Sequence, residues 1–518
     1  MIDGDMQAFA LTLDKFLDHA AKWRSNGQVV TARSGGRTDR IGYADLRDRA
    51  VRVSSVLAGL GVQAGDRVAT LAWNSQAHVE AWYAIMGMGA VCHTLNPRVT
   101  AEQLAAMVVQ SEARILIASA DLVSLARRIM AHAPGLIRLL IIDGEAEDGE
   151  PLEPMILTER GAAPWGRFDE TAPCGLCFTS GTTGAPKGVT YTHRSSYLHT
   201  LRALQADVMA ITGEDAVLAV VPMFHANAWG LPFAAPAVGA KLVLPGPYAD
   251  GASLARLIAA EDVTIAVGVP TVWLGLLEHL ETHGGELPSL RRIMVGGAPM
   301  PPALMERLEQ RLGVKVQTSW GMTELSPCGT MASLGAPSAA AVSGRPAVGL
   351  DLLLTDADGV ALPEQRDVEG HLRVRGASVI ERYFGFETPA TDADGWFATG
   401  DLARIDAEGN LIITGRAKDL IKSGGEWINP VEIEAAVCAL PEVSLAAVIG
   451  RPHPKWGERP ILLVETQGEV SDEALLESLR GRVASWWMPD AIYRLARMPL
   501  ASTGKIDKIR LRSEYGAG

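Results

Sequence analysis

Glycine, hydroxyl and lysine side chains gather in the stretch 179–188, which reads Thr-Ser-Gly-Thr-Thr-Gly-Ala-Pro-Lys-Gly. Gly181, Gly184 and Gly188 allow tight turns and let backbone N–H groups come close to an anion. Lys187 adds a mobile positive charge. The hydroxyl donors of the stretch are Thr179, Ser180, Thr182 and Thr183. This combination suits the binding of a polyphosphate.

The stretch 179–188 differs from a Walker P-loop in the residues beside its lysine. Pro186 precedes the lysine and Gly188 follows it, whereas the Walker motif needs Gly before and Ser or Thr after. A flexible surface loop is the alternative interpretation of a lone glycine-rich segment. The apolar residues 176–178 predict a short buried strand directly before the stretch, at the kind of strand end where α/β proteins bind ligands.

The order of these residues resembles the phosphate loop of the acyl-adenylate-forming superfamily, which contains acyl- and aryl-CoA synthetases, luciferases and adenylation domains of peptide synthetases. A second stretch, 318–324, reads Thr-Ser-Trp-Gly-Met-Thr-Glu and resembles the superfamily's aromatic-Gly-x-Thr-Glu motif. By this resemblance, Trp320 borders adenine and the acyl group, and Thr323 binds the α-phosphate. Glu324 holds Mg²⁺, and Thr179 is the second candidate ligand of that ion. Carboxylate and phosphate oxygens together are what a hard cation prefers.

Further motifs extend the expected ATP site. Gly296 and Gly297 end an expected strand and, lacking side chains, let a flat adenine lie against the backbone. Asp401 can accept both ribose hydroxyls, and Arg416 can add contacts with its rigid fork; the two match the superfamily's ribose-binding pair. The ATP-binding residues that the resemblance implies are Thr179, Ser180, Gly181, Thr182, Thr183, Gly184, Lys187, Gly297, Ala298, Thr318, Ser319, Trp320, Gly321, Met322, Thr323, Asp401, Arg416 and Lys505.

Lys505 lies in a Thr-Gly-Lys turn near the C-terminus and matches the superfamily's catalytic lysine. The resemblance implies that it reaches the α-phosphate and the attacking carboxylate, where it offsets the negative charge that builds as two anions meet. The catalytic residues that the resemblance implies are Lys505, His225, Glu324 and Thr323. An ordinary solvated lysine is the alternative interpretation of Lys505.

The segment around residue 420 resembles the superfamily's hinge and its CoA-facing loop. Lys418 stands at the hinge position. The residues implied to bind CoA are Lys422, Gly424, Gly425, Glu426 and Trp427. A glycine turn with a packed tryptophan is the alternative interpretation of this loop.

The stretch 222–229, Pro-Met-Phe-His-Ala-Asn-Ala-Trp, supplies the candidate acyl pocket. His225 can be neutral or cationic and can meet a carboxylate or an adenylate. Trp229 matches a gating aromatic at the mouth of the acyl tunnel in the fatty acyl branch. The expected pocket residues are His225, Ala226, Trp229, Trp320 and Gly321. Core packing is the alternative for both His225 and Trp229.

The resemblance covers nearly the whole chain. Within the superfamily, the sequence is similar to bacterial medium- and long-chain fatty acyl-CoA synthetases and most similar to the branch of 3-methylmercaptopropionate–CoA ligases. The segments that support this resemblance are 224–229, 244–247, 422–427 and 453–460. It implies an enzyme that uses ATP, Mg²⁺ and coenzyme A to convert a medium-chain fatty acid or a 3-methylmercaptopropionate-like acid, through acyl-AMP, to a CoA thioester. The alternatives are an arylalkanoate- or cinnamate-CoA ligase and a standalone adenylation enzyme that loads a carrier protein.

Strand and helix patterns alternate between residues 40 and 320. A helix is expected at 76–88. Strands are expected at 68–71, 90–92, 114–118, 139–142, 216–221, 241–244, 264–267 and 292–295. Repeated alternation predicts parallel sheets with helices on their faces.

The chain then changes character. Asp/Gly-rich turns join expected strands at 350–354, 371–375 and 411–414. The fold class is therefore α/β and β subdomains in a large N-terminal domain, with a small mobile α+β C-terminal domain, which is the acyl-CoA synthetase fold. The expected boundaries are 1–415 for the first domain (α/β to about 343, β-rich at 344–415), 416–419 for the hinge and 420–518 for the second domain.

Composition excludes several classes of protein. A chain of 518 residues is too long for one core. A net charge of −13 argues against a nucleic-acid binder. Five cysteines, sparse and odd in number, fit a reducing cytoplasm, and Cys174-x-x-Cys177 is interpreted as part of the strand before the phosphate loop rather than as a zinc or redox motif. No secretory signal or membrane span is expected, and a homodimer is expected from the resemblance.

Overall fold

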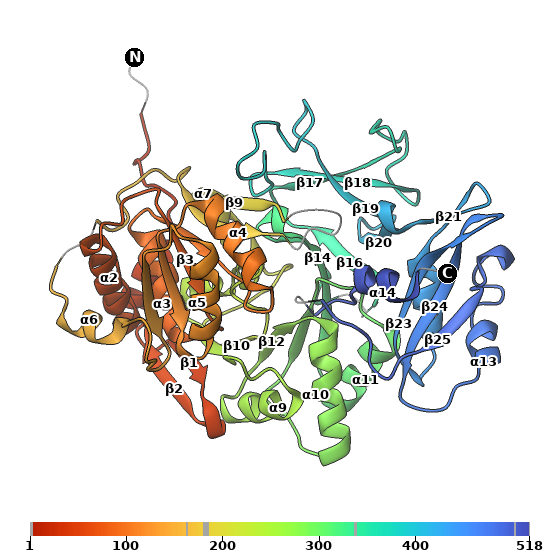
Figure 1. Ribbon diagram of the computed structural model, residues 1–518, viewed down its shortest axis with the longest axis horizontal. Coiled ribbons are helices and arrows are strands. Elements are labelled where there is room, and N and C mark those ends of the chain that lie inside the picture. Colours follow the sequence, from red (N-terminus) through yellow and green to blue (C-terminus); the bar gives the residue numbers. More distant parts are fainter. Residues whose placement is uncertain (1–3, 162–163, 180–185, 336–338, 502–503, 517–518) are drawn as a thin grey trace. The chain divides into compact units, whose positions relative to one another are not determined.

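The computed structural model describes residues 4–161, 164–179, 186–335, 339–501 and 504–516 (Figure 1). The chain forms two compact units. The first unit comprises Met1–Val267, Met322–Cys328 and Ala377–Ala390, and the second comprises Gly268–Gly321, Gly329–Gly376 and Thr391–Gly518. Two short pieces from the second half of the sequence therefore belong to the first unit.

The first unit contains a seven-stranded sheet, and the phosphate-loop stretch connects two of its strands. Its strand order is β7 (Glu150–Pro151), β6 (Arg138–Ile142), β5 (Ile115–Ser119), β3 (Arg67–Leu71), β4 (Val91–Thr94), β8 (Pro173–Phe178) and β9 (Gly188–Thr192). All neighbours are parallel except β8 and β9, which are antiparallel. Parallel strands covered by helices are apolar on both faces, which explains why β3, β4 and β5 are buried along almost their whole length.

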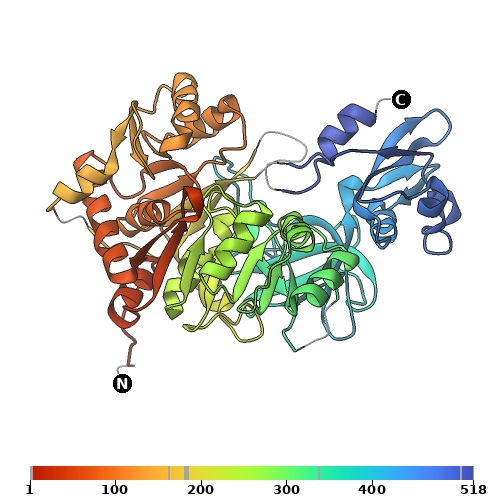
Figure 2. The ribbon, with the colours of Figure 1, turned by 90° about the horizontal axis from the view of Figure 1, so that it is seen from below.

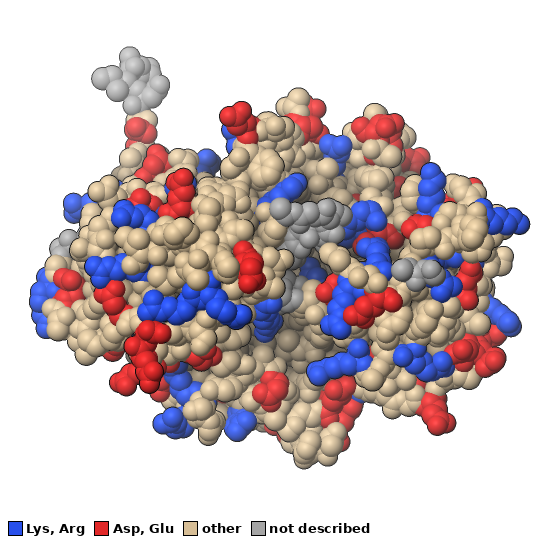
Figure 3. Space-filling model, viewed as in Figure 1, with Lys and Arg blue, Asp and Glu red and all other residues tan. Residues whose placement is uncertain are grey.

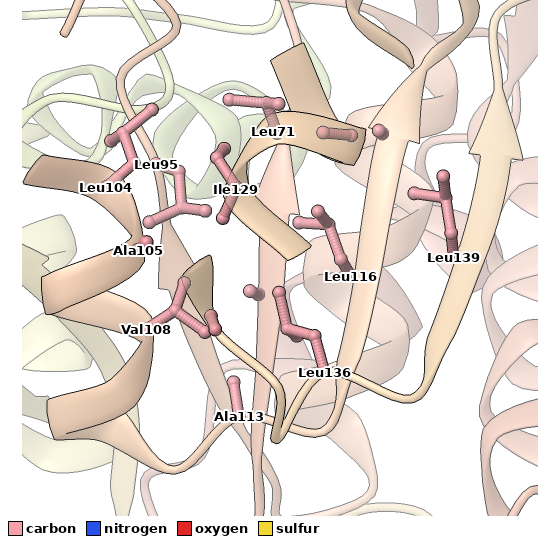
Figure 4. Close-up of a cluster of buried hydrophobic side chains, with 14 of the residues drawn as sticks. Leu71, Leu95, Leu104, Ala105, Val108, Ala113, Leu116, Ile129, Leu136 and Leu139 are labelled. Atoms are coloured by element: carbon pink, nitrogen blue, oxygen red, sulfur yellow. The ribbon is translucent and has the colours of Figure 1, made fainter. Parts of the chain in front are cut away.

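Helices α4 (Ala101–Ser111) and α5 (Val123–His132) cover one face of this sheet (Figure 4). Their apolar side chains, among them Leu104 and Ile129, meet Leu71 and Leu116 from the strands in one buried cluster. Each fully buried leucine or isoleucine contributes about 1.5–3 kcal/mol relative to an exposed one. This packing fixes the strands whose ends carry the site.

A second set of strands in the first unit has the order β12 (Ile265–Gly268), β10 (Ala216–Ala219), β11 (Lys241–Leu244), β1 (Gln28–Ala32) and β2 (Thr38–Gly42). All neighbours are parallel except β1 and β2. The helices of this unit besides α4 and α5 are α1 (Asp14–Trp23), α2 (Tyr43–Gly59), α3 (Gln76–Gly87), α6 (Leu152–Thr158), α7 (His193–Ala203), α8 (Leu231–Val238) and α9 (Gly251–Ala260). Asn74 donates from its amide to the carbonyls of Ala219 and Val221 and accepts from the Met223 N–H, which anchors the segment after β10.

The second unit contains a largely antiparallel run of strands. Its order is β17 (Leu350–Thr355), β18 (Glu369–Gly376), β19 (Phe397–Ile405), β20 (Leu411–Arg416), β16 (Val342–Pro346), β15 (Cys328–Met331), β14 (Lys315–Gly321) and β13 (Arg292–Val295). β13 and β14 are parallel neighbours, whereas β15–β16, β16–β20, β17–β18, β18–β19 and β19–β20 are antiparallel pairs. Helices α10 (Pro270–His283) and α11 (Pro302–Leu312) belong to this unit.

The C-terminal part of the second unit has a sheet of its own, drawn in blue in Figure 2. Its strand order is β22 (Glu426–Ile428), β21 (Ile421–Ser423), β24 (Gly457–Thr466) and β23 (Val443–His453), with β25 (Ala491–Arg494) also paired to β24. Its helices are α12 (Pro430–Val437), α13 (Asp472–Glu477) and α14 (Lys508–Tyr515). The side chain of Ser471 accepts from the Ala474 N–H and caps the N-terminus of α13.

The expected fold is confirmed. The predicted strand at 241–244 is β11, that at 292–295 is β13, and the predicted helix at 76–88 is α3. The expected hinge at 416–419 lies inside the second unit and stays a prediction. None of the described helices combines the length and the apolar character that crossing a bilayer requires. Acidic and basic side chains are interspersed over the face drawn in Figure 3.

Candidate functional site

The phosphate-loop stretch connects the two strands of an antiparallel hairpin, β8 and β9. Phe178 pairs with Gly188, and the Thr179 N–H donates to the Lys187 carbonyl at 2.9 Å. A side chain at 188 would put its Cβ 2.9 Å from the Phe384 Cβ, so this position requires glycine. Five of the predicted loop residues lie outside the described residues: Ser180, Gly181, Thr182, Thr183 and Gly184. Cys174 and Cys177 are buried free thiols within β8, as the sequence interpretation placed them.

Lys187 and Glu324 both contact Tyr383, which the sequence analysis did not single out. The Lys187 ammonium lies 4.7 Å from the centroid of the Tyr383 ring and 6.0 Å from that of Phe386. The Tyr383 hydroxyl donates to Glu324 Oε1 at 2.9 Å. One phenol therefore joins the loop lysine to the carboxylate that the sequence predicts as the metal ligand.

Glu324 lies in a short buried turn. It belongs to η4 (Thr323–Leu325), and its side chain is 7% exposed. The Tyr191 hydroxyl donates to the Thr323 carbonyl at 2.8 Å. Burial raises the pKa of the Tyr383 phenol, and the negative charge of Glu324 raises it further, so the phenol stays protonated and remains a donor.

Glu324 fits a magnesium ion that arrives with a nucleotide. Within the described ranges there is no group of three or more His, Cys, Asp and Glu side chains able to hold a metal ion. Mg²⁺ in nucleotide sites uses one or two carboxylates, water and phosphate oxygens rather than a protein cage. The single buried carboxylate of Glu324, which shares its neighbour Tyr383 with Lys187, matches that donor set. Thr179, the second predicted ligand, is half-buried at the end of β8.

The candidate acyl segment has an unusual backbone. The φ angles are 45° at Ala226, 51° at Asn227, 46° at Ala228 and 54° at Trp229, so four consecutive residues are left-handed. Left-handed helical conformation costs roughly 1–2 kcal/mol for each non-glycine residue, and such strain clusters at functional sites. His225 and Trp229 are half-buried, whereas Ala226 is buried. Apart from the glycine at 230, no residue of the stretch predicts this conformation.

In the second unit, the side chains of Trp320 and Arg416 meet at Asp401. The Trp320 indole N–H donates to Asp401 Oδ2 at 2.8 Å, and Arg416 Nε lies 2.9 Å from Asp401 Oδ1. Asp401 is 3% exposed and pairs with Arg416 across strands β19 and β20. A carboxylate oxygen has two lone pairs, so each oxygen keeps one position for a ribose hydroxyl.

The remaining predicted nucleotide residues of this unit follow β13 and β14. Gly297 has a φ of 80° directly after β13, and Ala298 follows it. The Ser319 hydroxyl donates to the Val295 carbonyl at 2.9 Å, and the Thr318 hydroxyl donates to the Val342 carbonyl. Thr318 and Ser319 therefore use their hydroxyl protons within the fold. Gly321 ends β14, and Met322 is the first residue of the next piece of the first unit.

The predicted hinge and CoA residues lie around β21 and β22. Lys418 is in η5 (Ala417–Asp419), and both burial and the charge of Arg416 lower its pKa. Asp419 beside it pairs with Arg512 of α14 at 2.8 Å. The Lys422 ammonium lies 5.4 Å from the ring centroid of Trp427.

The turn between β21 and β22 is built from glycine. Gly424 and Gly425 have φ angles of 63° and 93°, in the region that favours glycine. Glu426 opens β22 and is exposed, and Trp427 beside it is 52% exposed. The turn thus presents an aromatic ring and a cation outward.

Lys505 belongs to a turn that its backbone closes. Its carbonyl accepts from the Ala501 N–H at 2.7 Å, and the side chain is half-buried. Gly504 before it has a φ of 81°. Thr503 lies outside the described residues, Gly504 and Lys505 lie in a turn, and the role of the lysine stays a prediction.

Comparisons with known proteins identify the family of the chain. The model of the family described as AMP-binding enzyme matches residues 16–384, and that described as AMP-binding enzyme C-terminal domain matches residues 432–505. The 3-methylmercaptopropionyl-CoA ligase of Ruegeria pomeroyi is 41% identical over 531 residues, 99% of this chain and 98% of its own. The medium-chain-fatty-acid–CoA ligase of Ectopseudomonas oleovorans is 39% identical over 535 residues, 99% of this chain and 97% of its own. The crystal structure of the anthranilate CoA ligase AuaEII with anthranoyl-AMP superposes with a TM-score of 0.88 at 25% identity, over 99% of both chains.

Proposed function

The chain belongs to the AMP-binding enzyme family and is an ATP-dependent acyl-CoA ligase, and we propose that its acid is a medium-chain fatty acid or an acid like 3-methylmercaptopropionate. The observation that carries this choice is the identity of 41% and 39%, over nearly the whole chain, to relatives named for these two acids. ATP and CoA are the co-substrates of such a ligase. The reaction passes through an acyl-adenylate.

In the first half-reaction the acid's carboxylate attacks the α-phosphate of ATP, and pyrophosphate leaves. Lys187 and the 179–188 stretch hold the β- and γ-phosphates in this proposal. Asp401 and Arg416 hold the ribose, and Lys505 offsets the charge between the reacting oxygens. Positioning and electrostatics account for most of the catalysis of such a step.

Magnesium belongs to this proposal through Glu324, with Thr179 as the second protein ligand. When bound, Mg²⁺ neutralises charge on the phosphate oxygens. The buried turn of Glu324 and its hydrogen bond from Tyr383 hold one carboxylate oxygen in place, which supports this role.

In the second half-reaction the CoA thiolate attacks the acyl carbonyl and AMP leaves. The proposal assigns the segment 420–518 to a mobile domain that turns about Lys418 between the two steps. The outward-facing Lys422 and Trp427 suit the path of CoA, since an aromatic ring and a cation can contact its nucleotide. One site can then serve two reactions.

The test of the substrate proposal is CoA-dependent release of AMP across a panel of acids with Mg·ATP. The panel contains straight-chain acids from short to long, 3-methylmercaptopropionate and phenylpropanoid acids. We expect the highest kcat/KM for a medium-chain acid or for 3-methylmercaptopropionate. A maximum at a phenylpropanoid acid would contradict the proposal and favour an arylalkanoate- or cinnamate-CoA ligase.

Assays with and without CoA test the remaining alternative, an enzyme that loads a carrier protein. Acid-dependent release of pyrophosphate, with no thioester formed when CoA is added, would favour that alternative. We further propose that the protein is cytoplasmic, in keeping with its five free, buried cysteines. We also propose that it is a homodimer. Light scattering gives the mass in solution, and a mass of 55.1 kDa, that of one chain, would contradict the dimer.

A further inference from the structure

We propose that Tyr383 is a positioning residue of the ATP site, which holds Glu324 for the magnesium ion and Lys187 for the phosphates. This inference rests on the proposed function of Glu324 and Lys187 and extends it to a residue outside the recognised motifs. All three residues belong to the first unit.

The contact with Glu324 restrains one oxygen of its carboxylate. The Tyr383 hydroxyl donates to Oε1 at 2.9 Å, which uses one of the two lone pairs of that oxygen. A glutamate side chain has three rotatable bonds, and holding its carboxylate in one orientation removes freedom that ligand binding would otherwise have to remove. Hydrogen bonds to the ligands of a metal tune its affinity in this way.

The contact with Lys187 uses the other part of the same side chain. The ammonium lies 4.7 Å from the Tyr383 ring centroid, within the range of a cation–π interaction. Lys187 is an exposed residue near the end of the phosphate-loop stretch. The ring of Tyr383 therefore contacts a cation, while its hydroxyl contacts the carboxylate of Glu324.

Backbone hydrogen bonds hold Tyr383 in this place. The Phe384 N–H donates to the Gly188 carbonyl at 2.8 Å, and the Ile380 N–H donates to the Glu324 carbonyl at 3.0 Å. The segment Ala377–Ala390 is thus fastened on one side to the base of the β8–β9 hairpin and on the other to the turn of Glu324. A residue between two such anchors is suited to setting the distance between the groups they carry.

The experiment measures binding of ATP by calorimetry at a series of Mg²⁺ concentrations, with no acid present, for the wild type, Tyr383→Phe and Tyr383→Leu. Tyr383→Phe keeps the ring and removes the hydroxyl, so we expect the Mg²⁺ concentration for half-maximal ATP binding to rise about tenfold or more. Tyr383→Leu removes the ring as well. We expect its ATP affinity at saturating Mg²⁺ to be about two- to fivefold lower than that of Tyr383→Phe. Tyr493→Phe is the matched control, since it also removes a phenol that takes part in a hydrogen bond, here with Arg451 at 3.1 Å in the C-terminal sheet.

A second measurement separates positioning from damage to the fold. Conversion of supplied acyl-AMP to acyl-CoA needs neither Mg²⁺ nor the β- and γ-phosphates, so Tyr383→Phe should retain this rate within about twofold. Unchanged Mg²⁺ dependence in Tyr383→Phe, or parallel loss of both half-reactions, would overturn the inference. Absence of Mg·ATP binding in the wild type would overturn the proposed function together with it, whereas wild-type binding with an unaffected variant would overturn the role of Tyr383 alone.

Discussion

Asp401 is held by two side chains of the protein itself. The Trp320 indole donates to one oxygen, and the Arg416 guanidinium forms an ion pair with the other. Trp320 comes from the motif proposed to border adenine, so a hydrogen bond links the proposed base site to the proposed ribose site. Both residues are predicted from the sequence to bind ATP, but their contact with one another is not, because 81 positions separate them.

Trp320→Phe tests this link at the scale of one residue. It keeps an aromatic ring and removes the indole N–H, so the Asp401 carboxylate loses one of its two restraints. A hydrogen bond to a charged group is worth about 1.5–3 kcal/mol, and we expect the KM for ATP to rise about tenfold in assays of acid-dependent pyrophosphate release.

The control for this variant is Trp396→Phe, which alters a half-buried tryptophan of the same unit outside the proposed site. It should leave the KM for ATP within about twofold of the wild type, because the substitution lies away from the proposed ATP site. Equal KM values in Trp320→Phe and the wild type would show that the hydrogen bond does not orient Asp401.

At the scale of elements, the predicted hinge is a short 3-10 turn, η5, between β20 and β21. Lys418 is its middle residue, and Asp419 ties the turn to α14 through Arg512. Lys418→Pro restricts φ and should block a rotation while leaving the first half-reaction intact. We expect normal release of pyrophosphate and loss of thioester formation, measured separately with ATP and acid and with supplied acyl-AMP and CoA.

Two further variants complete that experiment. Lys418→Ala keeps the backbone free and should retain both half-reactions. Lys505→Ala should show the opposite pattern to Lys418→Pro, with a steep fall in adenylation and continued conversion of supplied acyl-AMP. If Lys418→Pro kept both rates, the hinge would not lie at this residue.

The elements that the sequence predicted best are those with a strong local pattern. Buried parallel strands such as β11 and β13 are short apolar runs between turns, and the predicted ranges coincide with them. Strand β9 and the segment Ala377–Ala390 were not predicted. The first follows directly on the phosphate loop and alternates polar and apolar residues over a short length, and the second has no regular structure of its own.

The missed contact of Tyr383 has the same cause. Its position depends on hydrogen bonds to Gly188 and Glu324, which are far from it along the chain. Periodicity and composition report on local structure, so they carry no information on such a contact. The string Tyr-Phe-Gly-Phe at 383–386, three aromatic residues around a glycine, was the available signal.

At the scale of the whole molecule, four histidines of the first unit link stability to pH. Burial lowers the pKa to about 4 for His78, to about 3 for His93 and to about 3 for His193, and burial together with Arg202 lowers that of His199 well below the ordinary value. His199 Nε2 accepts from the Cys328 N–H at 3.1 Å, and His193 Nδ1 accepts from the Leu13 N–H at 3.2 Å. Protonation at these nitrogens would break both bonds, so the fold requires the neutral rings.

The direction of the pH effect follows from comparing the folded and unfolded chains. An unfolded histidine has a pKa of about 6.5, so the unfolded chain binds more protons than the folded one below that pH. The contribution of the neutral histidines is complete above about pH 6.5 and is lost as the pH falls toward their folded values. Asp14 and Glu80, whose pKa values burial raises, act in the opposite direction, but they are two groups against four.

We therefore expect the apparent Tm of the first unit to fall between pH 7.5 and pH 5, by calorimetry in buffers of equal ionic strength. Each histidine contributes at most about 1.4 kcal/mol per pH unit in this window. His199→Gln supplies another acceptor for the Cys328 N–H without a titrating group, so its Tm should fall less over the same range than that of the wild type. His19→Gln, at an exposed position, should follow the wild-type curve. Parallel curves for His199→Gln and the wild type would mean that proton uptake by this buried histidine does not limit stability in acid.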